Sequence, residues 1–122
     1  MVLALFKINE HDAHLLLSDL IGIDSVNPSL VPGGAGEQRI AEFVCRYLDD
    51  LGLAARLDEV APGRPNVMGL LIGNGASGEF DRRHGLMING HLDTVGVSGM
   101  VREPLKAVVE GDRVFGRGAL DM

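Results

Sequence analysis

Cysteine, aromatic residues and long apolar runs are scarce in this chain of 122 residues. It contains one cysteine, one tyrosine, four phenylalanines and no tryptophan. Cys45 therefore has no partner for an internal disulfide, which fits a reducing compartment. No apolar run is long enough to span a bilayer, and Met1–Phe6 is too short for the apolar region of a signal peptide. We expect a cytoplasmic protein with no membrane partner.

Positive charge is also scarce. Eleven lysines and arginines stand against seventeen acidic residues, which gives a net charge of -6 and a pI near 5.0. Phosphate backbones are bound by clustered positive charge, and here Arg82–Arg83 is the only adjacent basic pair. Nucleic acid is therefore not an expected partner. The 46% of residues that are hydrophobic suffice for the core of one domain or part of one.

Two helices are predicted in the first half of the chain. Asn9 is a good N-cap for a helix that runs to about residue 23, where the approach to Pro28 ends it. A second helix is predicted from about Glu37 to Asp50, with Gly52 as its left-handed C-terminal cap. Apolar residues recur at helical spacing in both: Ala13, Leu16, Leu17, Leu20 and Ile21, then Ile40, Phe43, Val44, Tyr47, Leu48 and Leu51.

Strands are predicted in the second half. We expect strands at 53–60 and 66–73, and a third that begins at Leu86; the apolar residues of the second and third predict burial on both faces. The segment 101–110 has no regular pattern, and a tight turn is expected at 110–113. Helices followed by such strands indicate a layered α/β domain.

The stretch Gly90–Val95 carries the chemistry at the end of the third predicted strand. Strand side chains alternate between faces, so His91 and Asp93 point the same way. A neutral imidazole is a common zinc ligand, and a neighbouring carboxylate can hold its other ring nitrogen. The pair therefore indicates half of a metal site. The alternative is a structural, hydrogen-bonded histidine, and we interpret the other histidines as surface residues: His11, His14 and His84.

A second motif follows thirty residues after His91. Together, Gly90-His91-Leu92-Asp93-Thr94-Val95 and Gly116-Arg117-Gly118-Ala119-Leu120-Asp121-Met122 resemble one family of two-metal amidohydrolases and peptidases. It includes acetylornithine deacetylase, succinyl-diaminopimelate desuccinylase, aminoacylase and glutamate carboxypeptidase. The lead-in Ile23–Pro28 is similar to that family as well, so the resemblance covers nearly the whole chain.

The resemblance implies a role for each motif residue. His91 would bind one of two zinc ions (Zn²⁺, with cobalt as a possible substitute), and Asp121 would bridge both metals. Asp93 would be the catalytic-site carboxylate that orients His91. Carboxylate bridging fits two adjacent dications, which repel one another unless anionic ligands lie between them. Gly116 and Gly118 would let the backbone turn tightly toward the site.

The resemblance also implies that residues 1–122 are the N-terminal part of a longer catalytic domain. The expected fold is an incomplete three-layer α/β domain, a mixed sheet flanked by helices. In the family a Glu-Glu pair follows the bridging aspartate and supplies the general base and a metal ligand. That pair, the remaining ligands and a lid domain for homodimerisation would lie beyond residue 122. The isolated chain is then expected to be inactive.

The implied substrate is an N-acyl amino acid or a peptide, whose amide bond the complete enzyme would hydrolyse. Two alternatives stay open. The chain can instead be a small non-catalytic α/β interaction domain, in which both motifs are structural. It can also belong to another metal-dependent hydrolase such as a phosphoesterase, because metal ligands do not name a substrate. The acyl group and the amino acid are not defined by the motifs.

Overall fold

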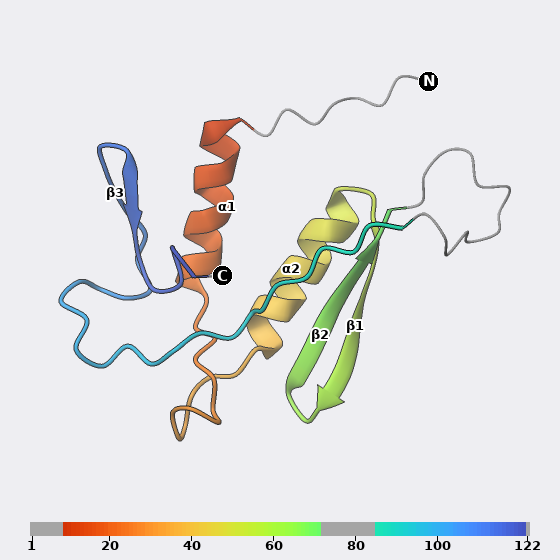
Figure 1. Ribbon diagram of the computed structural model, residues 1–122, viewed down its shortest axis with the longest axis horizontal. Coiled ribbons are helices and arrows are strands. Elements are labelled where there is room, and N and C mark those ends of the chain that lie inside the picture. Colours follow the sequence, from red (N-terminus) through yellow and green to blue (C-terminus); the bar gives the residue numbers. More distant parts are fainter. Residues whose placement is uncertain (1–8, 72–84, 122) are drawn as a thin grey trace, which may run out of the picture.

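The computed structural model describes residues 9–71 and 85–121 (Figure 1). In chain order its elements are α1 (Glu10–Gly22), α2 (Gln38–Asp50), β1 (Ala54–Ala61), β2 (Arg64–Leu70), β3 (Val108–Glu110) and β4 (Arg113–Phe115). The predictions for Met1–Phe6, Arg82–Arg83 and His84 lie outside the described residues. Within the described part of the chain, no helix has the length and apolar character needed to cross a membrane.

Both predicted helices form, with the predicted caps. Asn9 Oδ1 accepts a hydrogen bond from the Asp12 N–H at 2.8 Å, which satisfies one of the free N–H groups at the start of α1. After α2, Gly52 has φ +85, and its N–H donates to the Asp49 carbonyl. The next N–H, that of Leu53, donates to the Leu48 carbonyl, which completes a Schellman motif.

The strands β1 and β2 form an antiparallel hairpin that packs on α2 (Figure 1). Ala54 pairs with Leu70 at the open end, and Gly63 turns the chain at the other with φ +69. A Cβ at Gly69 would lie 3.0 Å from a methyl carbon of Leu48, so β2 and α2 approach closely there. The hairpin confirms the strand predicted at 53–60 and, within the described residues, the strand predicted at 66–73: β2 begins earlier, at Arg64, and ends at Leu70, and residues 72–73 lie outside the described residues.

A second, smaller hairpin joins β3 and β4 near α1 (Figure 1). The predicted turn at 110–113 is confirmed, with Gly111 at φ +61. The interpretation of 101–110 as irregular is wrong for its last three residues, which form β3. Arg102 reaches across this hairpin: its guanidinium pairs with Glu110 at 2.6 and 3.0 Å and lies over the Phe115 ring.

Two predictions about strand burial are wrong. The third predicted strand, expected to begin at Leu86, does not form: residues 85–93 belong to no strand, and Leu86, Met87 and Ile88 are 89%, 85% and 87% exposed. β2 is not covered on both faces, since Met68 and Leu70 are also exposed. A strand needs neighbouring strands to satisfy its backbone and cover its side chains, and the segment 85–93 has no such neighbour among the described residues.

The buried residues gather at the end of α1, in the segment that follows it and at the start of α2. The buried apolar residues of the described chain are few: Ile21, Val26, Ile40 and Ala41. Buried polar residues accompany them: Ser25, Glu37 and Arg117. The fold is therefore α/β, with two helices and two small antiparallel sheets. The three-layer arrangement with a mixed sheet stays a prediction.

Candidate metal centre

The segment 85–93 ends in a short parallel pairing with a distant part of the chain. Thr94 forms an isolated parallel bridge with Val26, just after α1. The Thr94 N–H donates to the Ser25 carbonyl at 3.0 Å, and the Thr94 carbonyl accepts from the Asn27 N–H at 2.9 Å. These backbone bonds fix the position of the residues just before Thr94, although they belong to no strand.

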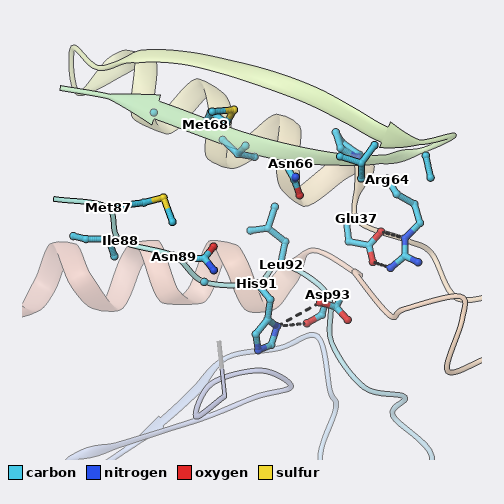
Figure 2. A pocket seen from close by; sticks show the side chains of 16 residues that line it. Glu37, Arg64, Asn66, Met68, Met87, Ile88, Asn89, His91, Leu92 and Asp93 are labelled. Atoms are coloured by element: carbon cyan, nitrogen blue, oxygen red, sulfur yellow. Dashed lines mark hydrogen bonds and ion pairs between the residues drawn. The ribbon is translucent and has the colours of Figure 1, made fainter. Parts of the chain in front are cut away.

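His91 and Asp93 lie side by side, as predicted, although the segment that carries them forms no strand (Figure 2). His91 Nδ1 lies 3.0 Å from the backbone carbonyl oxygen of Asp93 and 3.5 Å from its Oδ1. A carbonyl oxygen only accepts, so Nδ1 carries the proton. The closer acceptor is thus the backbone carbonyl, whereas the sequence pointed to the carboxylate. Either contact leaves the lone pair of the neutral ring on Nε2.

Asp121 reaches the same ring from the turn at 116–121. The Ala119 N–H donates to the Gly116 carbonyl at 3.3 Å. Gly118 has φ +77, a left-handed conformation that favours glycine. Asp121 Oδ1 then lies 3.3 Å from His91 Nε2, and the Asp121 side chain is 90% exposed. Two carboxylates from distant parts of the chain therefore converge on one imidazole, as the paired motifs predict.

The contact between His91 Nε2 and Asp121 Oδ1 brings two acceptors together when the imidazole is neutral. It becomes attractive when a cation lies between them, either a proton on Nε2 or a metal ion. The pKa of His91 is raised above its usual 6.5, mainly by the hydrogen bond to the Asp93 carbonyl. Desolvation opposes this rise, and the hydrogen bond to Asp121 and the charges of both carboxylates add to it. The site therefore favours positive charge at Nε2.

The spacing of the two donor atoms fits a zinc ion. Zinc–nitrogen and zinc–oxygen bonds of about 2.0–2.2 Å at a tetrahedral angle place two ligand atoms about 3.4 Å apart. His91 Nε2 and Asp121 Oδ1 lie 3.3 Å apart. However, no three histidine, cysteine or acidic side chains of residues 9–71 and 85–121 are grouped to hold a metal. The described chain thus offers two donors, and zinc sites ordinarily use three or four protein ligands.

A buried arginine that the sequence analysis missed joins the segments around the site. Arg117 is 4% exposed, and its guanidinium donates to the Thr94 hydroxyl and, at 2.8 Å, to the Ile23 carbonyl. Its backbone N–H donates to the Pro104 carbonyl, and Nη1 lies 3.7 Å from the Asp24 carboxylate. Burial lowers the pKa of Arg117. An arginine between two glycines predicts a turn, and nothing local in the sequence signals its burial.

A cleft of about 750 Å³ opens beside His91, between β2 and the segment 87–93 (Figure 2). At one end Arg64 forms a bidentate ion pair with Glu37, at 2.6 and 2.9 Å, and donates to Ser29 Oγ at 3.0 Å. Glu37 is buried at the start of α2. This pair holds the β1–β2 hairpin against the helix, so it fixes one wall of the cleft.

Comparison with known protein families and with solved structures finds no match. Two curated proteins are similar to the chain. The N-formyl-4-amino-5-aminomethyl-2-methylpyrimidine deformylase of Bacillus subtilis is 29% identical over 119 residues, which cover 95% of this chain and 26% of the relative. An uncharacterized metallohydrolase of Methanocaldococcus jannaschii is 32% identical over 124 aligned positions, covering 90% of this chain and 28% of the relative.

The chain thus spans about a quarter of the length of the curated relatives it matches. Their names fit metal-dependent hydrolases in general. They do not single out the acetylornithine deacetylase and peptidase family that the motifs resemble.

Proposed function

We propose that this chain forms part of the catalytic domain of a metal-dependent hydrolase that cleaves the amide bond of N-acyl amino acids or peptides. The observation that supports this most directly is the contact between His91 Nε2 and Asp121 Oδ1 at 3.3 Å. Two acceptors from residues thirty positions apart face one another at the spacing of two ligands on one zinc ion. Zinc is the proposed metal, with cobalt as a possible substitute.

In this proposal each residue of the site has a separate task. His91 and Asp121 would hold the metal, and Asp93 would keep the proton on Nδ1 of His91 so that Nε2 can bind. When bound, zinc polarises a carbonyl group and lowers the pKa of water. The cleft beside His91 would receive the substrate, with apolar surface from Met68 and Met87.

The name of one relative supports an amide bond as the target, and the name of the other supports a metal-dependent reaction. A deformylase that acts on an N-formyl compound removes an acyl group from nitrogen, and the second relative is named as a metallohydrolase. A phosphoesterase would instead need cationic groups that face the cleft. Arg64 at that cleft is already paired with Glu37. No contact in the described residues favours the interaction-domain alternative.

The test is a zinc titration of the 122-residue chain with ¹⁵N-labelled histidine, followed through the imidazole nitrogens. Zinc should shift the ¹⁵N resonance of His91 Nε2 at millimolar rather than nanomolar zinc concentrations, because the described residues supply only two ligands. His91→Gln and Asp121→Asn should abolish this site, whereas His14→Gln on α1 should leave it unchanged. A zinc affinity that is unchanged in Asp121→Asn, or zinc binding that does not shift the His91 imidazole resonances, would overturn the proposed metal centre.

A second measurement addresses catalysis. The isolated chain should not hydrolyse N-acetylornithine or N-formyl amides above a control with zinc alone. The reason is that no third donor lies near His91 and Asp121 in the described residues to complete the site. Turnover by the purified chain that His91→Gln removes would show that the site is already complete.

A further inference from the structure

Asn27 makes two directed contacts with its side-chain amide. Its Oδ1 accepts from the Ser29 N–H at 2.8 Å, in a local turn. Its Nδ2 donates to Asp93 Oδ2 at 2.7 Å. Because Oδ1 faces an N–H donor, the orientation of the amide is fixed and the NH₂ group must face the carboxylate. The Asn27 amide can therefore act only as a hydrogen-bond donor to Asp93.

This bond determines how the Asp93 carboxylate is presented to His91. The terminal torsion of an aspartate is broad, and the Asp93 side chain is 31% exposed, so packing alone does not hold it. With Oδ2 engaged by Asn27, the other oxygen, Oδ1, lies 3.5 Å from His91 Nδ1. The backbone supports the arrangement, since the Asn27 N–H also donates to the Thr94 carbonyl.

We propose that Asn27 is a positioning residue of the metal centre, which acts on His91 through Asp93 and does not touch the metal itself. The inference rests on the proposed function, because it assumes that His91 Nε2 is a metal ligand. The proposal assigns a role to the segment that follows α1, and this segment lies outside both sequence motifs. In this chain of contacts Asn27 fixes Asp93, and Asp93 in turn helps to fix the His91 ring.

The first variant is Asn27→Ser. Serine can still accept from the Ser29 N–H through its hydroxyl, but it cannot reach Asp93 as the amide does. The chain offers a matched control in Asn9, which also accepts from a backbone N–H at 2.8 Å and donates to an aspartate, Asp12, at 2.7 Å. Asn9→Ser therefore removes the same kind of bond at the start of α1, away from His91.

The probe is the zinc ion alone, added to the full chain and followed by the His91 imidazole signals. Asn27→Ser should weaken zinc binding about tenfold, the effect typical of losing a residue that supports a ligand. Asn9→Ser should leave the affinity unchanged. In an Asp93→Ala background, Asn27→Ser should not weaken zinc binding further, because the carboxylate through which Asn27 acts has been removed. Urea melts of each variant show the folded fraction, to which every affinity is referred.

Asn27→Asp provides a second variant that separates positioning from charge. It keeps the acceptor for the Ser29 N–H but places a carboxylate against Asp93. Added negative charge alone would strengthen the binding of a dication, so a weaker affinity would show lost positioning. Failure of wild-type zinc binding at His91 would overturn the proposed function and this inference with it. Wild-type binding with an unchanged affinity in Asn27→Ser, or the same loss with and without Asp93, would overturn the inference alone.

Discussion

Gly116 begins the turn that carries Asp121, and it lies directly against the buried side chain of Ile21. A Cβ added at Gly116 would lie 2.6 Å from Ile21 Cγ2, 2.8 Å from Cδ1 and 3.2 Å from Cγ1. Ile21 is 2% exposed, so its side chain has no solvent-filled space to move into. Gly116 is not among the glycines with positive φ, so the cost of Gly116→Ala is steric rather than conformational.

The expected loss of stability follows from this crowding. Forcing an extra methyl group into a well-packed site costs about 1–3 kcal/mol. We expect about 2–3 kcal/mol for Gly116→Ala, because the methyl group would meet all three outer carbons of one buried side chain. If the turn shifts to relieve the overlap, Asp121 moves away from His91, so zinc binding should weaken as well.

The assay is urea unfolding of Gly116→Ala beside a matched variant, Gly85→Ala. Gly85 also lacks a positive φ, and a Cβ there meets no described atom within 4 Å. This control should be neutral or slightly stabilising. The melts are run in an osmolyte that favours the folded state, so that destabilised variants still show a transition. An equal loss in both variants would refute the steric argument.

The cause can be isolated in an Ile21→Ala background. That substitution removes the three carbons that the new methyl group would meet, and alone it should cost about 2–5 kcal/mol. In this background Gly116→Ala should be neutral or stabilising, because the methyl group enters the space that Ile21 vacated. The same penalty in both backgrounds would show that the overlap with Ile21 is not the source of the loss.

Further predictions concern His91, Arg117 and Met87. Because the pKa of His91 is raised in the folded state, the protonated His91 side chain stabilises the fold fully below pH 6.5, and this stabilisation is lost as the pH rises through the folded-state pKa. Urea melts of wild type and His91→Gln should therefore differ only at low pH. Arg117→Met should cost about 1–3 kcal/mol in the same melts, because the Ile23 carbonyl loses its buried partner; no change would contradict this. Met87→Lys should reduce self-association of the chain in sedimentation, because residues 86–88 form an exposed apolar segment; an unchanged sedimentation profile would show that this segment does not mediate association.

The helices and their ends were predictable because their signals are local. The N-cap at Asn9 and the left-handed glycine at Gly52 act within four residues along the chain. The tight turn before Arg113 is local in the same way. Each of these features depends on backbone geometry that a few neighbouring side chains decide, so the sequence pattern is sufficient.

The strand predicted at Leu86 failed for the opposite reason. An apolar run reports that a segment can be buried, but a strand forms only where other backbones pair with it and other side chains cover it. Leu86, Met87 and Ile88 lie exposed in the described chain, without a paired strand. The same dependence explains β2, which forms its hairpin with β1 and yet leaves Met68 exposed.

The proximity of the motif residues was predictable from the sequence, whereas the residues that support them were not. His91, Asp93 and Asp121 carry a spacing that resembles a family, and the structure brings them together. Asn27 and Arg117 were missed because their partners are distant in the sequence. Asn27 bonds to Asp93, 66 residues away, and Arg117 bonds to Ile23, 94 residues away. Pairings at such a distance leave no periodic or short-range pattern in a single sequence.

The two halves of the candidate site are held in different ways, and this decides where it is most easily disturbed. His91 is held at Nδ1 by Asp93, and the backbone next to Asp93 is anchored through Thr94 to the segment after α1. Asp121 projects from an exposed turn, and its position follows from Gly116 packing on Ile21 and from the left-handed Gly118. A metal ion would join these halves, so its affinity includes the cost of bringing the turn to the ring. Substitutions in the turn should therefore weaken zinc binding without touching either ligand.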